Sequence, residues 1–143
     1  MSDPIEILLV DDNPSDAELT QHVLSRHGFG VGIFHAHDGA EALDFLLATG
    51  AYAGRDPAQL PKMLLLDLYL PKADGFEVLR RVKDHPRTRA IPVVVLSSSW
   101  EARDQKRARE LGAHSYVVKP VDFAQFVEAV RTALAAAKEH GSK

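Results

Sequence analysis

The feature of this chain that most constrains its fold is an alternation, repeated five times, between short apolar runs and segments with helical spacing. Apolar runs of this length, separated by helices, are typical of βαβ units, in which successive strands are parallel. The alternation therefore predicts an α/β fold with a parallel sheet covered by helices. The strands are expected over residues 5–10, 31–36, 62–67, 92–97 and 114–118.

The segments between the strands have apolar residues at the spacing of helices that pack on a sheet. Typical helix starts occur at Asn13-Pro14 and Asp74-Gly75, and typical helix ends at Gly28 and Gly112. The residues expected to face the core are Thr20, Val23, Leu24 and His27 in the first helix, Val78, Leu79 and Val82 in the third, and Phe123, Phe126, Val127, Val130 and Leu134 in the last.

Length and composition limit the domain organisation and the partners. With 143 residues, 45% of them hydrophobic, the chain predicts one domain over residues 4–138, a frayed tail at 139–143 and no output domain. A net charge of −3 argues against a nucleic-acid partner, and the absence of cysteine excludes thiolate metal sites. The start lacks signal-peptide features, and no apolar run approaches the about 18 residues of a membrane span, so we expect a cytoplasmic protein without membrane contact. Residues 49–61 predict an unusually long loop.

Polar residues follow four of the expected strands. Asp11 and Asp12 come after the first, Asp67 ends the third, Ser97 ends the fourth and Lys119 follows the fifth. The carboxyl ends of parallel strands share one edge of a sheet, so these side chains are expected to converge. Mg²⁺ suits a few carboxylates completed by water and phosphoryl oxygens, and an ammonium and a hydroxyl supply a charge and a donor for a phosphoryl group. The sequence predicts a site for a divalent cation and a charged oxyanion.

These residues and their surroundings resemble the receiver domain of two-component response regulators. The resemblance covers almost the whole chain and rests on Asp11-Asp12, Asp67 within residues 66–75, Ser97 after residues 93–96, and Lys119-Pro120 after residues 116–118. It implies a flavodoxin-like (βα)5 fold, with a five-stranded parallel sheet of order 2-1-3-4-5 and helices on both faces. Residues 49–61, 91–99 and 119–121 are similar to single-domain regulators that pair with phytochrome-type histidine kinases.

The resemblance also implies the roles of the site residues. Asp67 would be the phosphoacceptor, taking a phosphoryl group from the phosphohistidine of a sensor histidine kinase. Asp12, Asp67 and the backbone carbonyl of Tyr69 would bind Mg²⁺ directly, and Asp11 would reach it through water. Lys119 would pair with the acyl phosphate.

A switch is implied as well. Ser97 would move to bond a phosphoryl oxygen and Tyr116 would fill the vacated space. This movement would alter the surface of the fourth helix, fifth strand and fifth helix, through which a homodimer is expected. The family also has a cis peptide bond that maps onto Lys119-Pro120. A smaller polar residue is frequent in the family at the position of Tyr69. The larger ring of Tyr69 is expected to hinder the attacking water and so slow loss of the phosphoryl group.

Two other classes of protein remain open. An aspartate-based, Mg²⁺-dependent phosphohydrolase uses the same type of nucleophile, but generally has a second acid two residues later, where this chain has Tyr69. A flavodoxin-type cofactor binder has the same strand order, but needs a phosphate-binding loop, and the first strand is followed by Asp11-Asp12-Asn13.

Two further groups of residues have a structural interpretation. His35 and His37 are two apart on a strand and could both face one side as metal ligands, but with no third ligand nearby in the sequence we interpret them as surface or satisfied histidines. The basic residues of the fourth helix alternate with acids, which indicates a solvated face rather than a nucleic-acid patch. These basic residues are Arg103, Lys106, Arg107 and Arg109.

Overall fold

The computed structural model describes residues 6–28, 32–68, 74–99, 101–119 and 123–141. Five strands form a parallel sheet in the order β2-β1-β3-β4-β5, as predicted. Each strand ends at the predicted residue and begins one or two residues later than predicted. The strands are β1 (Ile7–Val10), β2 (Ile33–Ala36), β3 (Met63–Asp67), β4 (Val93–Ser97) and β5 (Ser115–Val118).

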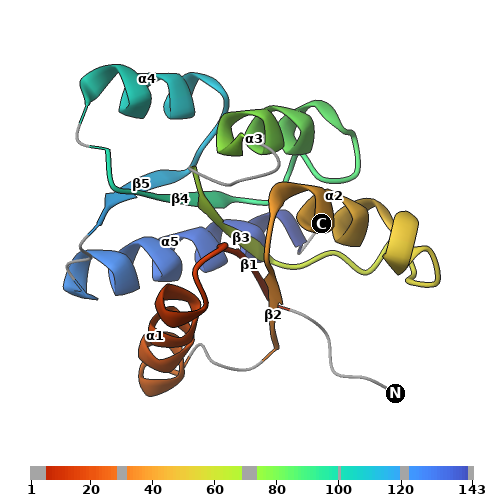
Figure 1. Ribbon diagram of the computed structural model, residues 1–143, viewed down its shortest axis with the longest axis horizontal. Helices are drawn as coiled ribbons and strands as arrows, with labels where there is room; N and C mark the ends of the chain where they lie inside the picture. Colours follow the sequence, from red (N-terminus) through yellow and green to blue (C-terminus); the bar gives the residue numbers. More distant parts are fainter. Residues whose placement is uncertain (1–5, 29–31, 69–73, 100, 120–122, 142–143) are drawn as a thin grey trace.

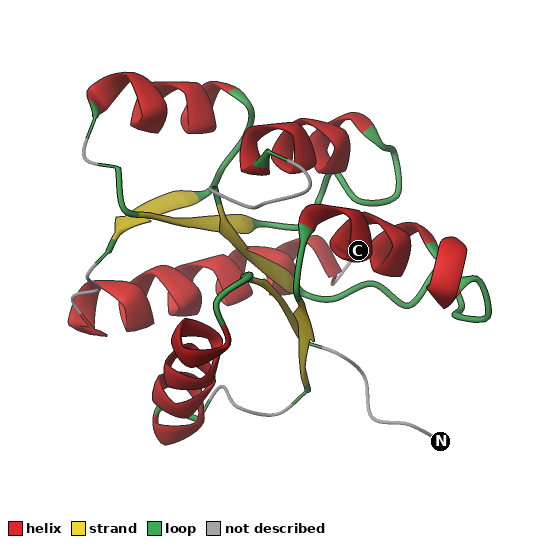
Figure 2. Cartoon of the chain, viewed as in Figure 1, coloured by secondary structure: helices red, strands yellow, loops and turns green. Residues whose placement is uncertain are grey.

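Helices cover both faces of the sheet. In Figure 1, α1 and α5 lie on one side of the strands and α2, α3 and α4 on the other, and Figure 2 shows the strands enclosed between the two helical layers. This arrangement confirms the predicted α/β architecture. The helices are α1 (Pro14–Arg26), α2 (Gly39–Leu47), α3 (Gly75–Asp84), α4 (Ala102–Glu110) and α5 (Phe123–Gly141), with a short 3-10 helix, η1 (Gly50–Tyr52), after α2.

The core consists of two layers separated by the sheet. Successive side chains of a strand point to opposite faces, so Leu8 and Val10 pack in the layer with α2 and α3, whereas Ile7 and Leu9 pack in the layer with α1 and α5. Both faces of the central strands are therefore apolar, which explains why they appear in the sequence as continuous apolar runs.

The predicted helix boundaries are confirmed. The Asn13 side chain accepts hydrogen bonds from the first turn of α1, which begins at Pro14, and the Asp74 side chain accepts from the backbone of Phe76 at the start of α3. Gly112 follows α4 with φ of 104°, a conformation that favours glycine after a helix.

One predicted core position is wrong. His27 is exposed, because α1 ends at Arg26 and His27 is its C-cap, where the ring nitrogen Nδ1 lies 3.0 Å from the carbonyl oxygen of Val23. Ala17 was not predicted as a core residue but is buried, and Thr20 is half-buried. The side chain of Phe123 lies outside the described part of the structure.

The long loop predicted at residues 49–61 is attached to α2. The Tyr52 hydroxyl donates a hydrogen bond of 2.5 Å to Glu41. The Arg55 guanidinium lies 3.6 Å from the centre of the Phe45 ring and donates to the carbonyl of Gln59 across 2.7 Å. The loop is therefore held by specific polar and aromatic contacts.

None of the helices in the described part of the chain has the length and apolar character that crossing a bilayer requires.

Candidate functional site

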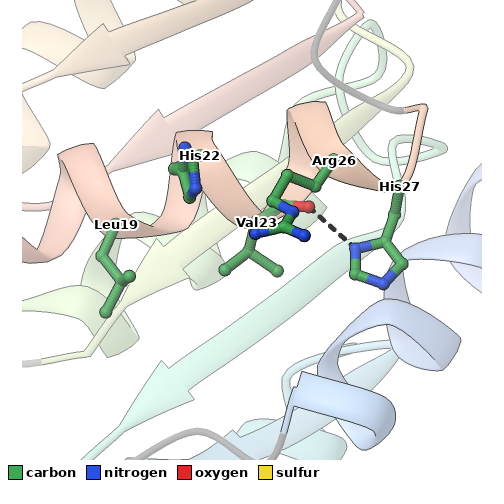
Figure 3. Close-up of a pocket in the computed structure, with 5 residues that line it drawn as sticks. All are labelled: Leu19, His22, Val23, Arg26 and His27. Carbon is green, nitrogen blue, oxygen red and sulfur yellow. Dashed lines mark hydrogen bonds between the residues drawn. The ribbon is translucent and has the colours of Figure 1, made fainter.

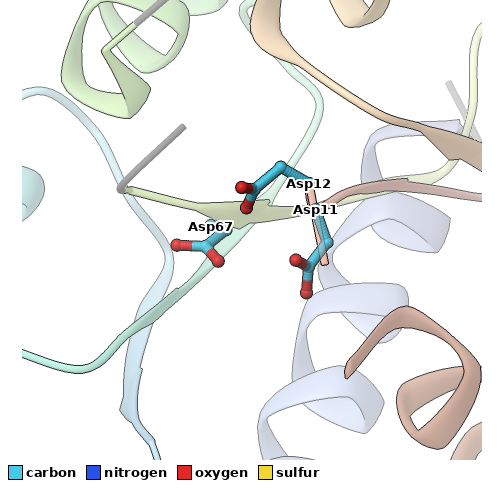
Figure 4. Close-up of side chains that lie close together, drawn as sticks. All are labelled: Asp11, Asp12 and Asp67. Atoms are coloured by element: carbon cyan, nitrogen blue, oxygen red, sulfur yellow. The ribbon is translucent and has the colours of Figure 1, made fainter. Parts of the chain in front are cut away.

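The ends of β1 and β3 bring three carboxylates together. The two strands are neighbours in the sheet, and their last paired residues are Val10 and Leu66, directly before Asp11 and Asp67. One carboxylate oxygen from each of Asp11, Asp12 and Asp67 lies within 4.8 Å of the others (Figure 4). The predicted convergence of these acids is confirmed.

Asp11 is the buried member of this group. One of its oxygens accepts a hydrogen bond of 2.9 Å from the backbone of Asn13. The other, Oδ2, is buried and has no hydrogen-bond partner among the described residues. Burial raises the pKa of Asp11 above its usual value, and the opposing effects of the Asn13 amide and the Lys119 charge do not cancel this increase. A buried carboxylate oxygen without a donor is the kind of group that a cation or its bound water satisfies.

Lys119 supplies positive charge at the same edge of the sheet. Its ammonium donates to Asp67 across 3.0 Å and to Asp16 across 3.4 Å, and lies 3.6 Å from Asp11. Burial alone would lower the pKa of Lys119, but the hydrogen bond and charge of Asp67, together with the charges of Asp11 and Asp16, raise it. Lys119 is therefore held as a cation next to Asp67.

Asp12 differs from Asp11 because its side chain is exposed. A cluster with buried and exposed carboxylates fits Mg²⁺ or a similar hard cation, which keeps part of its water shell when proteins bind it. Two predicted features lie outside the described residues: the carbonyl of Tyr69, and Pro120 with its peptide bond to Lys119.

Ser97 and Tyr116 belong to a chain of hydrogen bonds that leads to α4. Ser97 is buried, and its hydroxyl oxygen accepts from the amide of Ser99 across 3.1 Å. The Tyr116 hydroxyl donates to the carbonyl of Ser99 across 3.1 Å, and the Ser99 hydroxyl donates to Asp104 of α4 across 2.6 Å. The loop after β4 thus links the end of that strand to the first turn of α4.

The family model for the response regulator receiver domain matches residues 7–131, most of the chain. The chain belongs to this family. This receiver assignment confirms the resemblance found in the sequence, and it does not favour a phosphohydrolase or a flavodoxin-type cofactor binder. The match lies inside the predicted domain at residues 4–138.

Several relatives of this receiver domain are known. The probable methanogenesis regulatory protein FilR2 of Methanothrix harundinacea is 48% identical over 122 residues, which are 85% of this chain and 76% of FilR2. The response regulator Rcp1 of Synechocystis sp. is 39% identical over 116 residues, 81% of this chain and 77% of Rcp1.

Solved structures similar to this chain are also response regulators. The bacteriophytochrome response regulator AtBRR superimposes with a TM-score of 0.79 at 48% identity, covering 92% of this chain and 94% of AtBRR. The Mn²⁺-bound form of Rcp1 superimposes with a TM-score of 0.74, covering 81% of each chain. The receiver is therefore homologous to phytochrome-associated response regulators.

The start of α3 packs closely against the residue that follows Asp67. The Gly75 amide donates to the carbonyl of Leu68 across 2.9 Å. A methyl group added at Gly75 would lie 2.4 Å from the Leu68 Cα atom, closer than two carbon atoms can approach. Glycine at this position therefore allows α3 to support the backbone next to Asp67.

The two histidines are satisfied, as the sequence indicated. His35 Nε2 lies 2.7 Å from the backbone carbonyl oxygen of Asp11. His37 is exposed, with Nδ1 3.1 Å from Glu41. The basic residues of α4 are exposed as well, which confirms the predicted solvated face.

Two contacts were missed by the sequence analysis: the one from Asp16 to Lys119, and the one from His35 to Asp11. The helix start at Asn13-Pro14 was a usable signal for Asp16, because it puts this acid in the first turn of a helix that begins at the site.

A hollow on the receiver surface lies along α1 and is separate from the acidic cluster (Figure 3). It includes no carboxylate and so does not fit the cation expected at the acidic cluster. The residues that line it are Leu19, His22, Val23, Arg26 and His27.

Proposed function

We propose that this receiver domain accepts a phosphoryl group on Asp67 from the phosphohistidine of a sensor histidine kinase. The phosphorus–nitrogen bond of the donor would break, a bond from phosphorus to a carboxylate oxygen of Asp67 would form, and the histidine would be released. The observation that carries the proposal is the position of Asp67, whose carboxylate lies within 4.8 Å of two other acids and 3.0 Å from the Lys119 ammonium. Phosphoryl transfer depends mainly on such positioning and charge stabilisation.

The cation in this proposal is Mg²⁺, bound directly by Asp12, Asp67 and the Tyr69 carbonyl, and through water by Asp11. When bound, the ion would neutralise charge between the phosphoryl oxygens and the carboxylates. The buried oxygen of Asp11 that accepts no hydrogen bond from the described residues supports this proposal. So does the Mn²⁺-bound form of the relative Rcp1.

Lys119, Ser97 and Tyr116 complete the proposed switch. Lys119 would remain next to the acyl phosphate, and Ser97 would exchange its bond from Ser99 for a bond to a phosphoryl oxygen. Tyr116 is half-buried and shares the Ser99 backbone with Ser97, so the two side chains are placed to move together. The movement would reach α4 through the Ser99 hydroxyl and Asp104.

A phytochrome-type kinase is the proposed partner, because this chain is 48% identical to AtBRR over nearly its whole length. The proposed output is a homodimer formed through the surface of α4, β5 and α5, where the bonds from Ser97 end. Sedimentation with and without beryllofluoride tests this output. A beryllofluoride-induced shift toward dimer is expected, and a monomer under both conditions would contradict it.

The phosphoacceptor proposal is tested by incubating the protein with labelled acetyl phosphate and Mg²⁺. Wild type is expected to take up label, Asp67→Asn is expected to take up none, and Asp16→Asn is a matched control, since Asp16 also contacts Lys119. Equal labelling of wild type and Asp67→Asn would reject Asp67 as the acceptor. Phosphotransfer from a panel of histidine kinases would then identify the partner.

A further inference from the structure

His35 lies in β2, next to β1, and its side chain bonds to the backbone of Asp11 directly after β1. Its Nε2 atom is 2.7 Å from the carbonyl oxygen of Asp11. A carbonyl oxygen can only accept a hydrogen bond, so Nε2 must donate it. The side chain is half-buried, so this bond is partly shielded from water.

This bond extends the attachment of β1 to β2 beyond the regular ladder. The last paired residues of the two strands are Val10 and Ala36. The amide of Asp11 donates to the carbonyl of Ala36 across 3.1 Å, and the carbonyl of Asp11 accepts from His35. The peptide groups before and after Asp11 are therefore both bonded to β2.

The peptide group held by His35 is the one that joins Asp11 to Asp12. A peptide group is rigid and planar, so fixing it fixes the Cα atoms of both residues and restricts the directions of their side chains. One of these carboxylates is buried and the other exposed, and both must reach the same small volume beside Asp67. A rotation of this peptide would move the two carboxylates relative to each other.

We propose that His35 is a positioning residue that orients the Asp11 and Asp12 carboxylates for the divalent cation. The inference rests on the proposed function, because it assumes that the acidic cluster binds a cation. Groups that hold metal ligands in place typically change metal affinity by about 10- to 100-fold when they are removed. Loss of the His35 donor should therefore weaken cation binding although His35 is not itself a ligand.

The neighbouring histidine provides a matched control. The rings of His35 and His37 are in contact, with centroids 4.4 Å apart. However, the polar contacts of His37 are to Glu41, with its amide donating across 2.7 Å and its Nδ1 at 3.1 Å. The same substitution at His37 removes the neighbouring ring without removing the bond from His35 to Asp11.

The test compares Mn²⁺ affinity, measured from the electron paramagnetic resonance of free Mn²⁺, in wild type, His35→Asn, His35→Gln and His37→Asn. The amide nitrogen of Gln occupies the position of Nε2 along the side chain, whereas that of Asn is one bond too short. His35→Asn is expected to weaken Mn²⁺ binding about tenfold, with His35→Gln and His37→Asn close to wild type. If His35→Asn disturbs the fold, as judged by circular dichroism, His35→Phe keeps the ring and gives the same test.

Two results would overturn the inference, and they are distinguishable. If folded His35→Asn, or His35→Phe in its place, binds Mn²⁺ as tightly as wild type, the positioning role is wrong and the proposed function stands. If wild type binds no Mn²⁺, the cation site and the positioning role are both wrong.

Discussion

The ammonium nitrogen of Lys119 donates a hydrogen bond of 3.0 Å to the carboxylate of Asp67. The same nitrogen lies 3.4 Å from Asp16 and 3.6 Å from Asp11, so one cation faces three acids. The site keeps an excess of negative charge that a divalent cation can offset. Because Lys119 bonds directly to the Asp67 carboxylate, it is placed to contact the phosphoryl group that Asp67 carries in the proposed function.

Lys119→Met should lower the rate of phosphorylation by acetyl phosphate about 100-fold, because removal of one donor that stabilises a charged transition state typically has an effect of this size. The side chain of Met has a similar length and no charge. The rate of labelling under excess Mg²⁺ measures the effect, with Lys106→Met as the control, since Lys106 is exposed on α4. Labelling of Lys119→Met at the wild-type rate would exclude a role for this ammonium.

Asp11→Asn should stabilise the protein at pH 7 when no divalent cation is present. Burial raises the pKa of Asp11 in the folded state above the usual 3.8. Because the pKa of Asp11 is raised in the folded state, Asp11 contributes stability to the fold at pH values below 3.8. This stabilising contribution is lost as the pH rises through the folded-state pKa. The ionised carboxylate therefore lowers the free energy of unfolding at neutral pH, and an amide does not.

Urea unfolding with a chelator present measures this difference. The difference between wild type and Asp11→Asn should shrink as the pH is lowered, and excess Mg²⁺ should stabilise wild type more than the variant. Asp12→Asn is the control, because Asp12 is exposed and its substitution should change stability little in the chelator. A less stable Asp11→Asn at pH 7 would contradict this interpretation.

Tyr52 should make stability depend on pH in the alkaline range. Its hydrogen bond to Glu41 and, to a smaller extent, its burial raise the pKa of Tyr52 from 10.0 to about 12. The stabilising contribution of Tyr52 is therefore fully present below pH 10 and is lost as the pH rises toward 12. Tyr52→Phe should lose about 1 kcal/mol at neutral pH, the usual net value of a hydrogen bond.

The comparison is made by denaturant unfolding of wild type and Tyr52→Phe between neutral pH and the highest pH at which the fold persists. The two stability curves should converge as the pH rises above 10. Curves that stay parallel throughout would show that the Tyr52–Glu41 contact does not hold the loop at residues 49–61.

Gly75→Ala should destabilise the fold by about 2 kcal/mol, the middle of the range for overpacking a close contact. The added methyl would lie 2.4 Å from the Leu68 Cα atom and 2.5 Å from the Leu68 carbonyl oxygen, so α3 or the backbone after Asp67 must shift. Gly54→Ala is the control, since nothing lies within 4 Å of a methyl group there. Thermal unfolding of both variants tests the difference, and equal stabilities would contradict the close packing.

The ends of β1, β3, β4 and β5 could be predicted from the sequence because each is marked by a change from apolar residues to Asp, Ser or Lys, and β2 ends directly before His37. The first residues of the strands were predicted less accurately, for reasons that lie in the local backbone. Pro92 has no amide hydrogen to donate to the sheet, and β4 begins at Val93. Gly32 has φ of 73°, which is not an extended conformation, and β2 begins at Ile33.

The contact of His35 could not be predicted because it depends on the register between β1 and β2. The helix start at Asn13-Pro14 places Asp16 near the site, but its contact with Lys119 also depends on the direction of α1. A hydrophobic pattern shows that two strands exist, but does not show which side chain of one faces the backbone of the other. His27 was placed in the core because the helical spacing was continued one residue past the true end of α1. The roles of Tyr69 and of the Lys119-Pro120 peptide bond remain predictions from the family.

The central claim is that Asp67 itself carries the phosphoryl group, and the most direct test is to map the modified residue. The protein is phosphorylated, reduced with borohydride to convert the acyl phosphate to an alcohol, digested, and sequenced by mass spectrometry. In wild type the reduced side chain is expected at position 67, and in Asp67→Asn no residue is expected to be reduced. Reduction at Asp11, Asp12 or Asp16 with position 67 unmodified would contradict it.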